Sequence, residues 1–273
     1  MRNRFTGALV TAAAASLAVG AVQAQQQERP ERILGHPNLN GIWQALNTAH
    51  WNLEAHSAEA LEEFWQLGAL GAIPAGQSVV REGEIPYLPE ARQKRDENRA
   101  NWPEADPVVK CYMPGIPRAT YMPFPFQIFQ GDGDILMVYP FASTNRVINL
   151  EEHAEAVVDT WMGYSNGRWE DDTLVVETTG FNGQTWLDRA GNHHSNQLTV
   201  TERFTLIGPD HIQYEATLED PQTYSEPWTI EMPLYRIVDE NQQLLEYKCV
   251  PFTDMLLYHD LLEGLPDEEE SQE

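Results

Sequence analysis

Short runs of alternating apolar and polar residues dominate the chain from residue 126 onwards. The runs are rich in Val, Ile, Thr, Tyr and Phe, and turn sequences such as Asp-Gly and Asn-Gly separate them, as is typical of half-buried strands. We predict strands at residues 126–130, 135–141, 144–150, 168–170, 173–179, 198–207, 211–219, 228–238 and 243–249. Because no helical pattern lies between these runs, we expect an antiparallel sheet closed into a barrel or stacked as a sandwich.

Two charged residues on apolar faces favour the barrel. In residues 198–207, Glu202 lies between Val200 and Phe204 on the apolar face, and in residues 228–238 the apolar face carries Arg236. A charge in such a place is costly unless it is paired or hydrated. Two interpretations stay open: Glu202 and Arg236 form an internal ion pair that fixes the register, or the inner face lines a cavity in which Glu202 is a polar group.

Helical patterns belong mainly to the first part of the chain. Residues 54–70 carry apolar side chains at helical spacing, and residues 89–102 begin with proline and are mostly charged. A Gly-Ile-Trp sequence at residues 41–43 predicts a first strand and is weakly similar to the Gly-x-Trp of lipocalin-like (calycin) barrels, where the tryptophan plugs one end. We therefore predict an N-terminal extension with this strand and the helices at residues 25–105. An antiparallel β-barrel body follows at residues 106–262, with a short helix at residues 252–262.

Both ends of the chain differ in composition from this body. Residues 1–24 combine early arginines, a short Ala-rich apolar run and small residues before a cleavage point, which predicts a cleaved signal peptide and no remaining membrane span. Its removal would change the formal charge from −25 to −27, since two arginines leave with it. Such a surface repels nucleic acid and anionic lipid. The acidic residues 263–273 predict a disordered tail.

The only cysteines in the sequence are Cys111 and Cys249. A secreted chain permits a disulfide between them. A thiol nucleophile is the alternative, and we expect the disulfide.

Side chains capable of chemistry crowd the loop at residues 181–196 and its borders. They are Trp186, Asp188, Arg189, His193, His194 and Glu202. A histidine can act as general acid or base near neutral pH when a carboxylate orients it. The two histidines are adjacent, so at most one of them faces a given site. Arg118 lies in a proline-rich segment beside aromatic residues, where a fixed guanidinium would suit an anion or a carbonyl oxygen.

Familiar motifs for other chemistries are missing from the sequence. The eight histidines show no H-x-x-x-H or H-E-x-x-H spacing, and there is no P-loop or G-x-G-x-x-G sequence. We therefore predict no metal site and no organic cofactor.

Long motifs resemble a large, mostly uncharacterised family of secreted bacterial proteins. Residues 167–204 read GRWEDDTLVVETTGFNGQTWLDRAGNHHSNQLTVTERF, and the family pattern is roughly GxSxGxWEGDTLVV, GFN, TW, DxxG, HS and ER. The resemblance covers about residues 36–260 and differs at Asp171, where the pattern has glycine. The matching positions are Arg118, Trp169, Glu170, Trp186, Asp188, Gly191, His194, Ser195, Glu202, Arg203, Cys111 and Cys249. The resemblance favours His194 over His193 and implies no particular reaction.

These observations predict a periplasmic or secreted acid/base enzyme that acts on a small, mostly apolar or aromatic molecule by elimination, isomerisation or hydrolysis. His194 would be the general base or acid, Asp188 its orienting carboxylate, Glu202 a second acid or base, and Arg118 the holder of an oxygen atom. The expected substrate-binding residues are Trp186, Tyr121, Phe126 and Trp161. A lipocalin-like carrier of a small hydrophobic ligand is the alternative, and an envelope structural protein is a third possibility.

Overall fold

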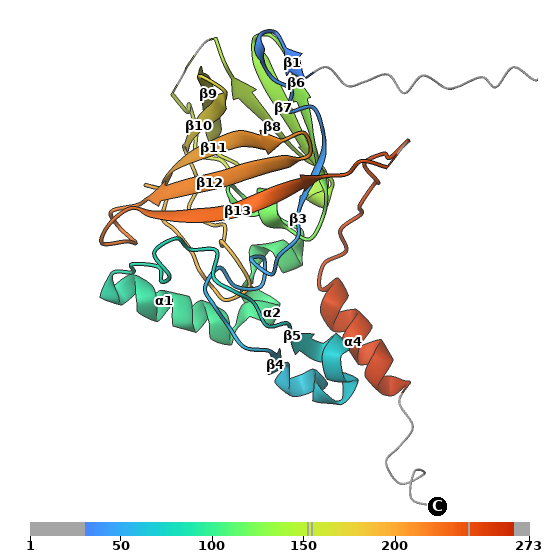
Figure 1. Cartoon of the computed structure of the whole chain (residues 1–273). Coiled ribbons are helices and arrows are strands. Elements are labelled where there is room, and N and C mark those ends of the chain that lie inside the picture. The colour runs from blue at the N-terminus through green and yellow to red at the C-terminus, as the bar shows by residue number, and fades with distance from the viewer. Residues whose placement is uncertain (1–30, 152, 154, 240, 265–273) are drawn as a thin grey trace, which may run out of the picture. The chain divides into compact units, whose positions relative to one another are not determined.

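In the part of the chain that the structure describes, nine strands close into a barrel (Figure 1). The structure is a computed structural model and describes residues 31–151, 153, 155–239 and 241–264. The barrel strands are β3 (Gly41–Ala45), β6 (Phe126–Gln130), β7 (Asp134–Tyr139), β8 (Thr144–Asn149), β9 (Tyr164–Glu170), β10 (Thr173–Thr179), β11 (Thr199–Gly208), β12 (His211–Glu219) and β13 (Trp228–Arg236). Their order around the barrel is β10-β11-β12-β13-β3-β6-β7-β8-β9. The predicted mainly β, lipocalin-like barrel is confirmed, and the strand of the N-terminal extension is part of it.

The barrel pairs are antiparallel at every junction but one. β8 and β9 run parallel, with Ile148 opposite Ser165 and Asn149 opposite Asn166. These consecutive strands point the same way, so a crossover joins them where a hairpin turn would join antiparallel strands. The expectation of a wholly antiparallel sheet is therefore wrong at this single pair.

The alternation of the strands sends one set of side chains into the barrel. On β12, Ile212, Tyr214, Ala216 and Leu218 are buried, as their spacing predicts. On β11, Glu202 is buried between Val200 and Phe204. The inner face is thus apolar with a charged residue inside it.

The Gly-Ile-Trp sequence closes one part of the barrel through an arginine from the last strand. The Arg236 guanidinium carbon lies 4.0 Å from the centre of the Trp43 ring, and Trp43 is fully buried. A Cβ atom on Gly41 would come within 2.4 Å of Arg236 Nη1. Glycine at this position therefore makes room for the guanidinium, which explains the spacing of the glycine and the tryptophan.

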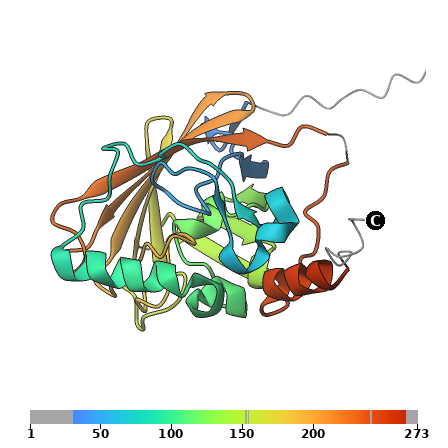
Figure 2. The same cartoon turned by 90° about the horizontal axis from the view of Figure 1, so that it is seen from below.

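Most of the remaining elements lie beyond one end of the barrel (Figures 1 and 2). The helices are α1 (Pro89–Ala100), α2 (Trp102–Ala105), α3 (Arg118–Tyr121) and α4 (Thr253–Glu263), with the 3-10 helices η1 (Glu62–Gly71), η2 (Pro107–Lys110) and η3 (Phe141–Ser143). Two small ribbons pair β1 (Arg32–Ile33) with β2 (His36–Pro37) and β4 (Glu59–Ala60) with β5 (Ala72–Ile73). Among these elements, α1, α2, α4 and the β4–β5 ribbon lie beyond that end, whereas β1 lies at the other end. The helices at residues 89–102 and 252–262 are confirmed within one or two residues.

The helix expected at residues 54–70 is wrong over its first half. His56 pairs through its backbone with Gly76, and β4 pairs with β5, so this stretch is extended. Only η1 is helical, and Phe64 and Gly68 interrupt its backbone. The apolar spacing reflects burial of Leu61 and Phe64 in a small cluster beside Trp102, while Trp65 is exposed.

The strand expected at residues 243–249 does not form. β13 already has two neighbours, β12 and β3, so the closed barrel offers no free edge to a further strand. Leu245, inside the expected strand, is 74% exposed. The predicted signal peptide at residues 1–24 lies outside the described residues, as does nearly all of the predicted acidic tail.

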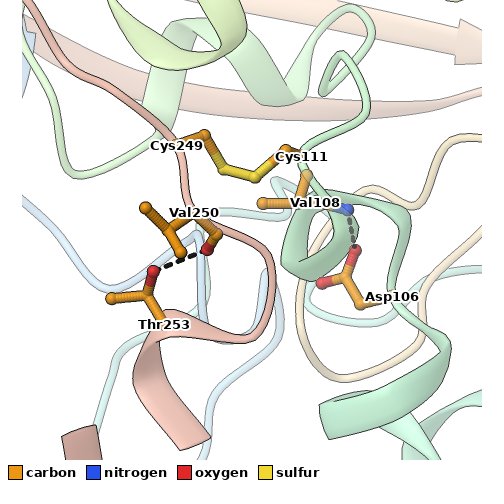
Figure 3. Close-up of a disulfide and its surroundings, with 6 residues drawn as sticks. All are labelled: Asp106, Val108, Cys111, Cys249, Val250 and Thr253. Atoms are coloured by element: carbon orange, nitrogen blue, oxygen red, sulfur yellow. Dashed lines mark hydrogen bonds between the residues drawn. A yellow bond between two sulfur atoms is a disulfide. The ribbon is translucent and has the colours of Figure 1, made fainter. Parts of the chain in front are cut away.

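The segment after β13 is tied to the chain before β6 by the Cys111–Cys249 disulfide (Figure 3). The two cysteines lie 138 residues apart in the sequence. Beside the bond, the Val108 amide donates to the Asp106 carboxylate at the start of η2, and the Thr253 hydroxyl donates to the Val250 carbonyl at the start of α4. The predicted disulfide is therefore present and fixes the approach to α4.

Candidate functional site

Glu202 belongs to a buried polar network inside the barrel. Its carboxylate pairs with Arg146 of β8 and accepts a hydrogen bond from the Tyr214 hydroxyl at 2.9 Å. Arg146 also donates to the hydroxyls of Ser165 and Thr178, each at 2.8 Å. Burial lowers the pKa of Arg146, but the carboxylate of Glu202 more than offsets it, so the net pKa is raised. Each charge thus has a partner within the barrel wall.

The predicted ion pair between Glu202 and Arg236 is wrong, because Glu202 pairs with Arg146 instead. Arg236 lies beside Asp210, with Nε 3.4 Å from Oδ1, and donates to backbone carbonyls, among them that of Asn38. Arg146 was missed, although the alternation of residues 144–150 places it on the same face as the buried Thr144 and Ile148. That spacing was the signal for an inward arginine on β8.

His194 is buried, and both of its ring nitrogens are engaged. Nδ1 lies 2.7 Å from the carbonyl oxygen of Ser195, and Nε2 lies 2.6 Å from the Thr185 hydroxyl. Since a carbonyl oxygen only accepts, Nδ1 carries the proton and Nε2 accepts from Thr185. Burial lowers the pKa of His194, which keeps the ring neutral. These contacts tie the loop to itself.

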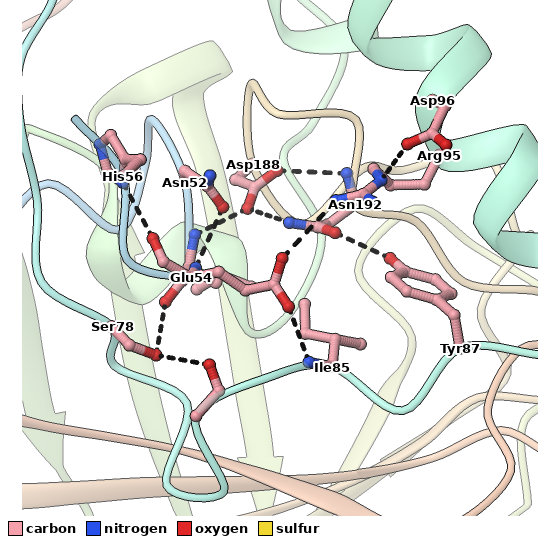
Figure 4. Close-up of polar contacts among 12 residues, drawn as sticks. Asn52, Glu54, His56, Ser78, Ile85, Tyr87, Arg95, Asp96, Asp188 and Asn192 are labelled. Carbon is pink, nitrogen blue, oxygen red and sulfur yellow. Dashed lines mark hydrogen bonds and ion pairs between the residues drawn. The ribbon is translucent and has the colours of Figure 1, made fainter. Parts of the chain in front are cut away.

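Asp188 has a different set of partners (Figure 4). Its carboxylate accepts from the backbone amides of Leu53 at 2.9 Å and Asn192 at 3.2 Å, and from the Asn192 side chain at 2.6 Å. Within the described residues, no hydrogen bond joins it to His194. Burial raises the pKa of Asp188 to about 6, although these hydrogen bonds and nearby Arg118 oppose the shift.

Arg118 is fully buried and paired with a carboxylate that the sequence did not single out. Nη1 and Nη2 lie 2.8 and 2.7 Å from the two carboxylate oxygens of Asp106, and Nη1 is 3.5 Å from the Trp186 carbonyl oxygen. Arg118 is also close enough to affect the pKa of Asp188 and of His50. Of the four expected catalytic residues, Arg118 and Asp188 are therefore neighbours, while His194 and Glu202 bond to other groups.

The four expected substrate-binding aromatics lie in separate packing environments. Phe126 stacks on Tyr139 in the barrel core, and the Tyr121 hydroxyl donates to the Leu187 carbonyl at 2.9 Å. Trp186 belongs to the cluster around η1 and α2, and Trp161 stacks on Tyr112 at 4.8 Å between ring centres. Within the described residues, the four side chains therefore have four different sets of neighbours.

A pocket of about 250 Å³ lies where six separate segments meet. Its wall includes the rings of Trp51, Phe124, Phe141, Tyr247 and Tyr258. Cys249 of the disulfide also lines it, so the covalent link holds part of this wall in place. Besides its two tyrosines, the wall carries the charged or titratable groups of His50, Arg189 and Asp254. A cavity of about 150 Å³ can hold benzene, so this pocket suits a single substituted ring.

His50 is the buried titratable group of this pocket. It is 4% exposed, and its Nδ1 is buried without a hydrogen-bond partner. Its pKa lies well below the ordinary value because the ring is buried and because Arg189 and Arg118 are close. A neutral imidazole with an unpartnered nitrogen is therefore available at neutral pH.

Arg189 is held in the pocket wall by two tryptophans. Its guanidinium carbon lies 4.4 Å from the centre of the Trp51 ring and 5.1 Å from that of Trp102. Nη2 lies 2.6 Å from the Asp254 carboxylate of α4, whereas Nε is buried without a hydrogen-bond partner. Arg189 also lines a second pocket of about 180 Å³.

The sequence named Arg189 only as one of several side chains near the loop, and His50 as one of eight scattered histidines. A short-range signal for His50 is absent from the sequence, because the charged residues close to its ring are the distant Arg118 and Arg189. Among the described residues, no group of His, Cys, Asp and Glu side chains is arranged to hold a metal ion. Helices with the length and apolar character to cross a bilayer are likewise not found in the described part of the chain.

Comparison with known proteins adds no family assignment to this geometry. No protein-family model matches the chain, and no curated protein matches it significantly. The resemblance to secreted bacterial proteins therefore stays a prediction.

Proposed function

We propose that this chain is a lipocalin-like binding protein for a small, mostly aromatic molecule, which occupies the pocket between His50, Arg189 and α4. The observation that carries the proposal is a ring-lined pocket whose wall includes His50 and Arg189, each with one buried nitrogen that has no hydrogen-bond partner, His50 Nδ1 and Arg189 Nε. A few fixed polar groups in an apolar wall are typical of small-molecule sites. Leaving such groups unpaired is unfavourable, so a ligand that pairs them gains affinity.

A pocket-filling variant tests this location. Val109→Phe adds bulk to the pocket wall, and Val147→Phe adds the same bulk to an exposed position of the barrel. In calorimetric titrations with benzamide and benzoate, we expect the natural protein to bind at least one probe with Kd of about 1 mM or tighter. Val109→Phe should weaken this binding at least about tenfold, because the larger side chain takes up space in the pocket. Val147→Phe should leave the binding unchanged. Equal binding by the Val109→Phe variant, or binding of neither probe, would contradict the proposal.

Acid/base catalysis is the second candidate, and the neutral His50 is the observation that favours it. A general base has to be unprotonated, and the lowered pKa of His50 meets this condition at neutral pH. The sequence-based set of His194, Asp188, Glu202 and Arg118 stays a competing prediction for a lyase, isomerase or hydrolase. His194 has both ring nitrogens engaged, whereas His50 has one unpartnered, so His50 fits the role of base better.

Catalysis and binding differ in their expected pH dependence. With His50 as base, turnover of an aromatic ester or hydroxy acid falls at acidic pH and is flat from about pH 6 to 8, because the pKa of His50 lies below its usual value near 6.5. His50→Gln should then abolish turnover. His194→Gln should lower the free energy of unfolding before it affects turnover. A carrier shows no turnover, and its affinity is flat over the same range. Loss of turnover in a stably folded His194→Gln protein would favour the sequence-based set instead.

A periplasmic or secreted location belongs to the same proposal. The Cys111–Cys249 disulfide supports it, because such bonds persist in oxidising compartments. N-terminal sequencing of the mature protein tests the predicted cleavage after residue 24, and a start at Met1 would contradict it.

A further inference from the structure

The position of Arg189 does not depend on the carboxylate that it binds. Trp51 and Trp102 hold the guanidinium on its ring faces, and the Arg189 amide donates to the His50 carbonyl at 3.0 Å. The carboxylate that pairs with Arg189 is that of Asp254, which belongs to α4. If Asp254 moves away, Arg189 keeps these contacts and presents an unneutralised cation to the pocket.

α4 is anchored by the partly buried Met255, Tyr258 and Leu262, which pack against the cluster around Phe64. An exchange at Arg189 therefore involves the Asp254 side chain and leaves the helix in place. None of the residues of α4 is buried, and the Asp254 side chain is 37% exposed. Two rings of α4 contact η1: Tyr258 and His259 each lie 5.1 Å from Phe64, measured between ring centres. The Arg189 side chain is only 14% exposed, so its charge needs a partner, whereas the Asp254 side chain reaches solvent. Replacing Asp254 by another carboxylate keeps that charge paired and therefore costs little.

Asp254 satisfies the guanidinium incompletely. It bonds Nη2, while the N–H at Nε is buried and has no acceptor. A carboxylate that is free of the chain can orient to take both N–H groups of this edge, which is the geometry that arginine prefers.

We infer that the ligand of this pocket is a single-ring aromatic carboxylate that displaces Asp254 from Arg189, so that α4 carries an internal competitor for the site. The inference rests on the proposed binding function and names its ligand class. When Asp254 leaves, a carboxylate restores the charge balance, whereas a neutral amide of the same shape leaves Arg189 unpaired. The pocket therefore discriminates by charge among rings of one size.

The experiment compares benzoate with benzamide by calorimetry in four proteins. The natural protein should bind benzoate about tenfold tighter than benzamide, since one hydrogen-bonded pair is charge-assisted. Asp254→Asn removes the competing carboxylate. The affinity for benzoate should then rise about three- to fivefold, the size expected when one partner of the ion pair is accessible to solvent. Arg189→Gln should abolish the preference for benzoate. Asp260→Asn, an exposed acid on the same helix, is the matched control and should leave both affinities unchanged.

The outcomes separate the ligand class from the pocket. Equal binding of benzamide and benzoate, or no gain in benzoate affinity with Asp254→Asn, would overturn the inference while the proposed pocket stands. Absence of binding of both probes to the natural protein would overturn the inference together with the proposed function.

Discussion

Burial decides the chemistry of individual residues in the region around the pocket. The same loss of water lowers the pKa of His50 and His194 and raises the pKa of Asp188, because in each case it disfavours the charged form. The hydrogen bonds then divide their roles. His194 and Asp188 have their polar atoms engaged by neighbouring loop atoms, whereas one nitrogen of His50 has no partner.

Asp188→Asn should change how stability depends on pH. The pKa of Asp188 is about 6 in the folded protein and roughly 3.9 in an unfolded chain, so the folded state holds the proton more tightly between these values. The free energy of unfolding of the natural protein should therefore rise, relative to Asp188→Asn, by about 2–3 kcal/mol as pH falls from 7 to 4. Urea unfolding at several pH values measures this difference.

The natural protein and Asp188→Asn contain the same histidines. The contribution of these histidines to the pH dependence of stability therefore cancels in the comparison. The asparagine also loses acceptor capacity towards Leu53 and Asn192, but that cost is the same at every pH. Asp132→Asn, at an exposed turn, should show no such slope. A difference between the natural protein and Asp188→Asn that stays constant from pH 7 to 4 would refute the raised pKa.

The strands β8 and β11 are linked by the ion pair between Arg146 and Glu202 across the barrel interior. Arg146→Met should lower the free energy of unfolding by about 3–5 kcal/mol, because it leaves a buried carboxylate without its cation. Arg203→Met removes an outward arginine of β11 from an exposed pair with Glu170 and should cost about 1 kcal/mol or less. Chemical denaturation of both variants gives the two values.

A double variant, Arg146→Met with Glu202→Leu, should recover most of the stability lost by Arg146→Met, since neither charge is then left unpaired. If Arg146→Met is no more destabilising than Arg203→Met, the pair does not hold β8 against β11.

At the level of elements, the sequence predicted most strands because their inner faces are buried. β6, β10 and β12 have the expected bounds, and the inward position of Glu202 follows from alternation alone. The first half of β9 was missed, since Tyr164–Gly167 contains polar residues and a glycine that packs against Ile148. The strand expected at residues 243–249 was wrong because only the closed barrel shows that β13 has no free edge.

Across the whole molecule, the candidate pocket could not be predicted because no single segment contains it. His50, Arg189 and Asp254 come from distant parts of the chain, and the rings between them come from further segments. The sequence could mark the loop at residues 181–196 as rich in chemistry, and Arg189 lies in it. That the loop meets η2, η3 and α4 is a property of the tertiary structure alone.

If Asp254 competes with a ligand for Arg189 as proposed, the disulfide affects how strongly it does so. Cys249 is fixed to Cys111 and lies only a few residues before Asp254 along the chain. A short tether of this kind presents a group at an effective concentration in the range of about millimolar. An aromatic acid that binds Arg189 must therefore compete with a local carboxylate at that concentration. The covalent link thus raises the ligand concentration that is needed to occupy the pocket. Opening the bond would lengthen the tether, dilute Asp254 at the site and lower that ligand concentration.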